Sequence, residues 1–175
     1  MMRLIDSKTF MEKVYEESHK KIFDFLYKYT NNPEIAMDLM QETFYNFYRS
    51  YGNQDMSNEK AIMLLYTIAR NNSINYSKKF STVKEKNSDV EAYESGKVSF
   101  EKKQELKDME QKLQECLEFL PEDQKTAIIL KNMQDMTLEQ ISGVMEVSIS
   151  TVSRLVVKAT ASLLNLAEKH GINPY

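Results

Sequence analysis

The sequence predicts an all-α protein of two small helical domains joined by a flexible linker, and three observations lead to this fold class. Its 175 residues include only 4 glycines and 3 prolines, too few breakers for the many turns of an all-β fold. Apolar residues recur at three- and four-residue spacing, the period of an amphipathic helix. That pattern fails between Ser81 and Ser99, where polar residues dominate. We therefore expect a first domain at 7–80, a linker at 81–102 and a second domain, ending in a helix-turn-helix, at 103–170.

Composition and charge exclude several classes of protein. The longest apolar run, from Ala61 to Tyr66, is far shorter than the roughly 18–20 residues of a membrane span. The N-terminal residues lack the apolar stretch of a secretory signal, and the single cysteine, Cys116, cannot form an internal disulfide framework or a cysteine zinc site. We therefore expect a soluble, cytoplasmic protein. The net charge is −3 and no segment is strongly basic, so the chain does not look like an autonomous DNA-binding protein.

Two helices are predicted before the first polar loop. The first extends from about Ser7 to Tyr29. The second follows a turn, with Asn32 as its N-cap and Pro33 at its first helical position, and extends to about Tyr51. The residues expected to face the core are Phe10, Val14, Ile22, Phe25, Leu26 and Tyr29 in the first helix, and Ala36, Leu39, Met40, Phe44, Phe47 and Tyr51 in the second.

The outward face of the second helix carries acidic and amide groups beside a tyrosine. Asp38, Gln41, Glu42, Tyr45 and Arg49 lie on one side by their spacing, opposite the apolar stripe. Such a face suits docking onto a basic protein surface better than onto DNA, whose phosphates would repel it. The plainer interpretation is an ordinary solvated helix face.

A third helix is predicted after the polar loop at 52–58, capped by Ser57 or Asn58 and ending near Phe80. It mixes aromatic, amide and cationic side chains, which together can stack on unpaired bases, bond their edges and pair with phosphates. In the alternative interpretation its tyrosines are core residues whose hydroxyls reach the surface. The residues of this mixed face are Tyr66, Arg70, Asn71, Asn75, Tyr76, Lys78, Lys79 and Phe80.

The second domain is predicted to begin with a charged helix and a shorter one. Leu106, Met109, Leu113, Leu117 and Leu120 form an apolar stripe on the charged helix. That helix ends before Pro121, because a residue that precedes proline is biased away from helical geometry. Pro121 then opens a helix that extends to about Met133.

A helix-turn-helix is predicted from Thr137 onward. Thr137 and Gln140 fit a capping box, and the short helix that they start ends near Met145. Residues 146–148 form a tight turn, and Ser148 caps a long helix that extends to about Lys169. A short helix, a three-residue turn and a capped longer helix are typical of this motif.

The last helix separates into two faces. Val152, Leu155, Val156, Ala159 and Leu163 form an inward stripe, whereas Ser150, Ser153, Arg154, Val157 and Lys158 form an outward one. The outward stripe begins at the helix N-terminus and can enter a major groove, with hydroxyls toward phosphates and an arginine toward a base edge. The alternative is a solvated face of a helical hairpin.

Catalytic signatures are missing from the sequence. His19 and His170 are isolated, and there is no glycine-rich phosphate loop, metal-spaced His/Cys cluster or nucleophile elbow. We expect a protein without catalytic residues, metal site or cofactor.

Four stretches of the chain resemble the bacterial RNA polymerase sigma factors. One is similar to their D-L-x-Q-E-x-F core-binding helix, one to the L-Y-x-I-A-R-N helix that contacts and melts the −10 promoter element, and two to the domain that reads the −35 element. The likeness follows one unbroken order from about residue 9 to 169, and the short length resembles the extracytoplasmic-function group, which has only the second and fourth sigma domains. The stretches are 32–44, 65–71 with 74–76, 120–124, and 137–152.

The resemblance implies an alternative sigma factor that binds core RNA polymerase and directs promoter recognition and melting. Its implied partners are the clamp helices and flap of core polymerase, promoter DNA and an anti-sigma factor. The residues implied to bind polymerase are Asp38, Leu39, Gln41, Glu42 and Tyr45. Those implied for the −10 element are Tyr66, Arg70, Asn71, Asn75, Lys78 and Lys79, with the 52–58 loop for a flipped base. Those implied for the −35 element are Ser150, Thr151, Ser153, Arg154, Val157 and Lys158.

The chain departs from the family pattern at four positions. Leu64 stands where a tryptophan is usual, Thr67 and Leu155 where arginines are found, and Glu146 where a glycine is found. Two other hypotheses stay open: a helix-turn-helix regulator that acts without polymerase, and a helical adaptor with no DNA role. The acidic second domain counts against the regulator, and the mixed face of the third helix counts against the adaptor.

Overall fold

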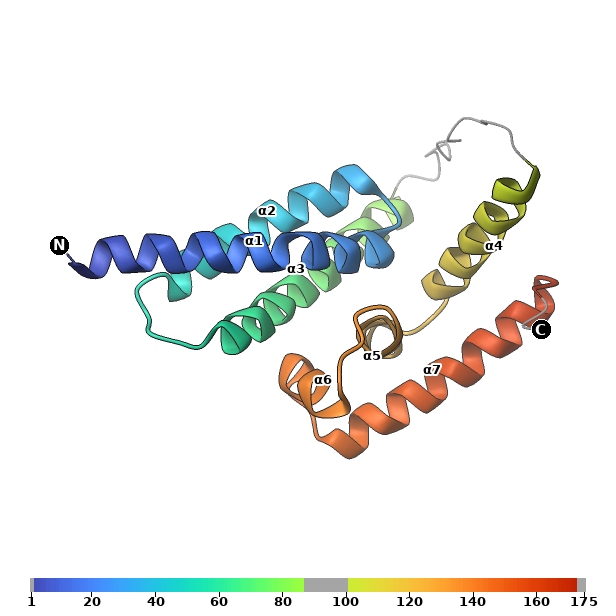
Figure 1. Cartoon of the computed structure of the whole chain (residues 1–175). Helices are drawn as coiled ribbons and strands as arrows, with labels where there is room; N and C mark the ends of the chain where they lie inside the picture. Colours follow the sequence, from blue (N-terminus) through green and yellow to red (C-terminus); the bar gives the residue numbers. More distant parts are fainter. Residues whose placement is uncertain (1, 87–100, 173–175) are drawn as a thin grey trace.

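The structure, a computed structural model, describes residues 2–86 and 101–172 (Figure 1). These residues form seven α-helices and no strand, so the predicted all-α class is confirmed. Helices α1–α3 lie together as one module, and α4–α7 form a second module beside it. The helices are α1 (Met2–Thr30), α2 (Pro33–Tyr51), α3 (Asn58–Lys86), α4 (Glu101–Glu118), α5 (Glu122–Asn132), α6 (Leu138–Met145) and α7 (Ile149–Lys169).

The first module has the core that the apolar spacing predicts. Of the residues expected to face inward on α1 and α2, most are buried, while Phe10, Phe44 and Tyr51 are partly buried against them. The apolar stripe of α1 is interrupted in the sequence, and Ser18 occupies the gap, fully buried with its hydroxyl donating to the carbonyl of Val14. Because that bond satisfies the hydroxyl, a polar residue is tolerated inside the bundle.

Local signals set the ends of α2. The Asn32 side chain accepts hydrogen bonds from the backbone N–H groups of Glu34 and Ile35, at 2.9 and 3.1 Å, so the predicted N-cap is confirmed. At the other end, α2 stops at Tyr51 as expected, and a Cβ atom on Gly52 would lie 2.5 Å from the carbonyl oxygen of Tyr48. Because glycine has no Cβ atom, the chain can pass this close to the Tyr48 carbonyl at the end of the helix.

The other helices of the first half extend farther than expected. Helix α1 begins at Met2 rather than near residue 7, and α3 continues past Phe80 to Lys86. Residues 81–86 contain no glycine or proline, so the helix propagates once it has formed. The remainder of the expected flexible linker, from 87 to 100, lies outside the described residues, and α4 begins at Glu101.

The helix-turn-helix forms as predicted. Thr137 and Gln140 make both bonds of the capping box, and Ser148 accepts the backbone N–H of Thr151 to cap α7. The axes of α6 and α7 meet at 101°, within the range of this motif. Glu146 ends α6 in the left-handed conformation, with φ of 56°.

Helix α4 departs from the expected inward stripe. Leu117 and Leu120 are buried, but Met109 is 52% exposed and Leu113 is 39% exposed. Among the side chains of α4 that the structure describes, which begin at Lys107, those near the C-terminus contribute to the core, and the predicted inward Leu106 lies outside them. Within the described residues, no helix by itself has the length and apolar character to cross a membrane; only the bent α6–α7 pair passes on length and composition.

Candidate functional site

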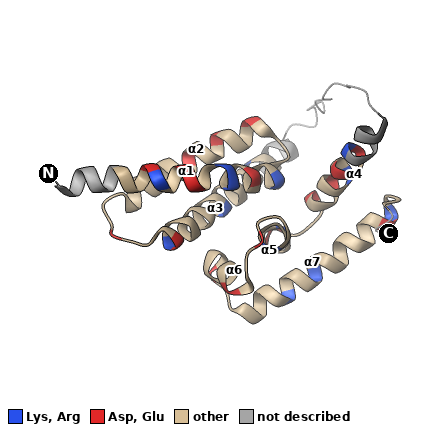
Figure 2. Cartoon of the chain, in the orientation of Figure 1, with Lys and Arg blue, Asp and Glu red and all other residues tan. Residues whose placement is uncertain are grey.

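The outer face of α2 presents the acidic and amide groups that the sequence predicts on one side. Asp38, Gln41, Glu42 and Tyr45 are exposed, and the guanidinium carbon of Arg49 lies 6.0 Å from the centre of the Tyr45 ring. Figure 2 shows acidic residues along α2. This surface is open to a partner.

Two residues change the composition of this face. Leu39 is only 7% exposed and faces the core, so it supports α2 instead of lining the surface. Tyr48, which the sequence argument missed, is 58% exposed. Its spacing of three residues from Tyr45 is the signal that could have found it.

The face of α3 that was predicted to handle single-stranded DNA begins with a buried tyrosine. Tyr66 is 1% exposed, and its ring packs edge-on against Phe25 at 5.7 Å between centroids. Its hydroxyl donates to Oε1 of Gln134, in the segment after α5, at 2.7 Å. Burial, with a smaller contribution from the Asp24 charge, raises the pKa of Tyr66 above its ordinary value. The first residue of the predicted face thus lies against the second module.

Arg70, one turn further along α3, is also tied to the second module. Its Nη2 lies 2.7 Å from Oδ1 of Asp123 on α5, and the side chain of Arg70 is 17% exposed. Between these two residues, the hydroxyl of Thr67 lies 3.1 Å from the carbonyl oxygen of Val144 on α6. Neither Asp123 nor Val144 was predicted from the sequence, because each partner is more than 50 residues away along the chain.

The distal part of the α3 face is exposed. Asn71, Asn75, Lys78 and Lys79 all reach solvent, and beside them Tyr76 and Phe80 stack with ring centroids 6.1 Å apart. Burial raises the pKa of Tyr76. This part keeps the combination of cations, amides and stacked rings that suits unpaired bases.

The loop between α2 and α3 is anchored at both ends. The backbone N–H of Gln54 donates to Tyr51 at 2.9 Å, and Ser57 accepts the N–H of Lys60 at 3.2 Å. Met56 packs against the core, while Asn53 is exposed. The loop therefore exposes polar side chains while its two ends are held by hydrogen bonds.

The two faces of α7 separate as predicted. Val152 and Ala159 are fully buried, whereas Val157 is 66% exposed. The outward residues Ser150, Arg154 and Lys158 are exposed, and Thr151 and Ser153 are partly exposed. Nη2 of Arg154 donates to the hydroxyl of Thr151 at 3.2 Å, which holds the guanidinium near the helix N-terminus.

Charge on α7 is sparse. Before Lys169 at its last position, α7 contains two basic residues, Arg154 and Lys158, and most of the helix is uncharged in Figure 2. Because affinity for duplex DNA grows with the number of neutralised phosphates, this face can aim at a groove but has little electrostatic attraction of its own.

Side chains of the second module cap the C-terminus of α1. Nζ of Lys125 donates to the carbonyl of Tyr29 at 2.7 Å and lies 4.6 Å from the centre of the Tyr29 ring. Gln114 donates to the carbonyl of Lys28, and the hydroxyl of Tyr29 donates to Glu122. The C-terminal end of a helix carries partial negative charge, which favours an ammonium group there.

The two ionisable groups of this cap have shifted pKa values. Burial lowers the pKa of Lys125, partly offset by the charges of Glu122 and Glu118. Burial raises the pKa of Glu122, with the Lys125 charge opposing it and Asp123 adding to it. Both directions follow from desolvation of the charged form at the contact between modules.

Comparison with known proteins gives two family matches and several relatives. The model of "Sigma-70 region 2" matches residues 14–81, and that of "Sigma-70, region 4" matches residues 110–163, so together they cover more than half of the chain. The chain is 27% identical to the RNA polymerase sigma-H factor of Pseudomonas aeruginosa, over 90% of this chain and 86% of that protein. It is 24% identical to the ECF RNA polymerase sigma factor SigM of Bacillus subtilis, over 93% of this chain and 98% of that protein.

A solved structure shares the fold. It is the sigma factor RpoE in complex with the anti-sigma factor NepR from Bartonella quintana, with a TM-score of 0.67 and 19% sequence identity. The match covers 90% of this chain and 96% of that one.

Proposed function

Because the chain belongs to the sigma-70 family and to its extracytoplasmic-function group, we propose that it is an alternative sigma factor that binds core RNA polymerase and directs promoter recognition and melting. The observation that carries the proposal is the order of the two matched regions along one chain, each with an exposed face of suitable chemistry. Helix α2 would bind polymerase, and α3 and α7 would contact the promoter.

Docking on polymerase is assigned to the outer face of α2. Asp38, Gln41, Glu42 and Tyr45 would meet the clamp helices of the core enzyme, with Leu39 fixing the helix from inside. A carboxylate-rich face with an aromatic group is complementary to a basic protein surface and repels DNA. The flap of the core enzyme is the partner proposed for the second module.

Promoter contacts are assigned to α3 and α7. Arg70, Asn71, Asn75, Lys78 and Lys79, with the 52–58 loop, would handle the −10 strand, while the buried Tyr66 would fix α3 from inside. The residues that would read the −35 element are Ser150, Thr151, Ser153, Arg154, Val157 and Lys158. Unstacking a base costs a few kcal/mol. A pocket that binds the flipped base repays this cost only for the base that fits, and so contributes to promoter selection.

Other properties follow from this role. The polymerase performs the chemistry, so the chain itself would act as an initiation factor and not as a catalyst. It would work in the cytoplasm, where the bacterial polymerase is. An anti-sigma partner is supported by the solved relative, whose partner is an anti-sigma factor.

A charge-reversal experiment tests the docking step. Asp38→Arg/Glu42→Lys should weaken retrieval of bacterial core polymerase at least about tenfold, since like charges placed across an interface cost several kcal/mol. Asp108→Arg/Glu110→Lys makes the same change of charge at two exposed positions of α4 and should leave retrieval unchanged. Circular dichroism checks that both variants stay folded.

The outcomes separate the site from the function. Full retrieval by the α2 variant would overturn the docking assignment. Failure of the unaltered chain to bind core polymerase at any salt concentration would overturn the sigma-factor function itself.

A further inference from the structure

We infer that α7 selects its −35 element mainly through the methyl groups of two thymines, with a single guanine contact beside one of them. Ile149 and Val157 each contact one thymine 5-methyl group, and Arg154 contacts the guanine. The inference rests on the proposed function, because it names the base pairs that the outward face of α7 would read.

The outward face of α7 consists of two parallel columns of side chains. Ile149, Ser153 and Val157 follow one another at four-residue spacing, so they lie in line along the helix surface. Arg154 and Lys158 are each one residue further along, so they form a second column, rotated by about 100° from the first. One column is therefore uncharged, and the other contains both cations that α7 has before its last position.

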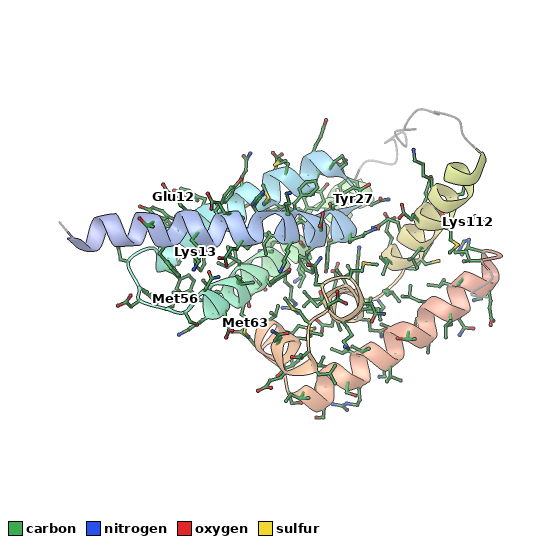
Figure 3. The ribbon with its side chains drawn as sticks, in the orientation of Figure 1. Glu12, Lys13, Tyr27, Met56, Met63 and Lys112 are labelled. Carbon is green, nitrogen blue, oxygen red and sulfur yellow. The ribbon has the colours of Figure 1, made fainter. Side chains whose placement is uncertain are left out.

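The uncharged column is exposed at both ends. Val157 is 66% exposed and Ile149 is 49% exposed, whereas Val152 on the inward face is fully buried. Figure 3 shows side chains extending from α7 both toward α5 and away from the rest of the molecule. Single apolar residues are common on protein surfaces, but here two of them flank the small Ser153 on one column, next to the only arginine of α7. Aliphatic groups thus occupy the outward side of the predicted recognition helix.

Thymine is the base that matches an aliphatic side chain in the major groove. It is the only one of the four bases that presents a methyl group there, and contact with that methyl removes apolar surface from water. Cytosine presents an amino donor instead, which an aliphatic neighbour would leave without a hydrogen-bond partner. Both ends of the uncharged column therefore favour thymine.

The two aliphatic residues contact different base pairs. Ile149 and Val157 are eight residues apart, which is about 12 Å along a helix axis. Neighbouring base pairs are about 3.4 Å apart along the duplex. We therefore expect two thymines about three to four base pairs apart.

Arg154 adds the one hydrogen-bonded base contact. Its Nη2 donates to the hydroxyl of Thr151 at 3.2 Å, and that hydroxyl lies 2.8 Å from the hydroxyl of Ser148. A guanidinium has five N–H donors, so one bond to Thr151 leaves enough of them for O6 and N7 of a guanine. Because Arg154 and Val157 are three residues apart on the helix, the guanine lies within about two base pairs of the thymine at Val157.

Base analogues that lack a single group test the inference. The holoenzyme of bacterial core polymerase and the unaltered chain first selects its −35 element from duplexes randomised at both promoter elements. The selected element should contain the two thymines and the guanine at the spacings given above. Deoxyuridine removes only the thymine methyl and should weaken binding about fourfold at each of the two positions. 7-Deazaguanine removes only N7 and should weaken binding at least about fivefold.

Variants assign each base to a side chain. Val157→Ala should abolish the deoxyuridine penalty at the thymine beside the guanine and keep it at the other thymine, and Ile149→Ala should do the reverse. Arg154→Ala should abolish the 7-deazaguanine penalty. Leu164→Ala truncates another exposed aliphatic residue of α7, nearer its C-terminus, and as the matched control should keep all three penalties. Each penalty is a ratio of two DNA affinities of the same protein, so a smaller folded fraction does not change it.

The outcomes separate this inference from the proposed function. Equal affinity for thymine and deoxyuridine throughout the selected element, or a selected element without thymine, would overturn the inference while the sigma-factor function stands. Deoxyuridine penalties that persist in both alanine variants of the uncharged column would overturn it as well. Failure of the unaltered chain to form a holoenzyme, which retrieval of core polymerase measures without any DNA, would overturn the proposed function and this inference with it.

Discussion

Tyr66 lies at the contact between the core of the first module and the second module. Its ring belongs to the core of the first module, and its hydroxyl reaches out to Gln134 of the second. The sequence is compatible with a stacking residue and with a core residue whose hydroxyl reaches the surface, and in the structure the ring is buried. Burial disfavours the charged phenolate, which is why its pKa is raised.

The raised pKa of Tyr66 predicts an alkaline loss of stability. The folded chain keeps the phenol protonated above the pH at which the unfolded chain ionises it, so this group's contribution is complete below about pH 10 and is lost as pH rises further. Tyr66→Phe should lower the free energy of unfolding near pH 7 by about 0.5–1.5 kcal/mol, through the lost bond to Gln134. It should also reduce the fall in stability above pH 10, measured by urea denaturation across pH 7–11.

Tyr48→Phe is the control for this prediction, because Tyr48 is exposed and the substitution removes a hydroxyl that is not in the core. It should change neither the neutral stability nor the alkaline slope. An identical alkaline slope in the Tyr66→Phe variant and the unaltered chain would contradict the prediction.

At the scale of elements, α6 is capped at its C-terminus by Glu146, whose left-handed backbone conformation is unfavourable for residues other than glycine. Glu146 has φ of 56° and ψ of 39°, and the N–H groups of Glu146 and Val147 both bond the carbonyl of Ser142, which is a common pattern at a left-handed helix end. Members of the family often have a glycine at this point, and the left-handed backbone supplies the physical reason.

Glu146→Gly should therefore raise the free energy of unfolding by about 0.5–1 kcal/mol, because the left-handed cost of an L-residue outweighs the added chain entropy of glycine. Thermal or urea denaturation measures the change. Glu139→Gly, the same substitution in the right-handed first turn of α6, should instead lower stability by up to about 1 kcal/mol. Destabilisation by Glu146→Gly would show that the side chain makes a compensating contact.

Elements with strong local signals were predicted to within a residue. Helix α2 has Asn32 and Pro33 at its start, and α6 and α7 have Thr137 and Ser148, whose caps depend on atoms only two or three residues apart. The end of α3 lacks such a stop signal, which is why the helix continues to Lys86. Met109 and Leu113 follow the apolar period of α4 and are exposed all the same.

At the scale of the whole molecule, charge is distributed so that a partner must supply the attraction to DNA. The chain has a net charge of −3, its α2 face is acidic, and α7 presents only Arg154 and Lys158 along its middle. Non-specific DNA affinity depends on neutralised phosphates, so the free chain has little of it.

The free chain should therefore show no promoter-specific shift in an anisotropy or gel-shift assay, while a mixture with core polymerase should bind and open a cognate promoter. Core polymerase without the chain is the control. Tight, sequence-specific duplex binding by the free chain would favour the alternative of a helix-turn-helix regulator that acts without polymerase.

The sequence by itself determined the helices, the caps, the helix-turn-helix and the family, because these depend on patterns within a few turns of the chain. It also placed the acidic face of α2 and the outward face of α7, since helical spacing alone sets which residues share a side. Only the tertiary structure decided which residues of the second module contact Tyr66 and Arg70 on the α3 face. Pairs such as Arg70 with Asp123 and Lys125 with Tyr29 join residues 53 and 96 positions apart, and no local pattern encodes which distant groups will meet when two modules pack.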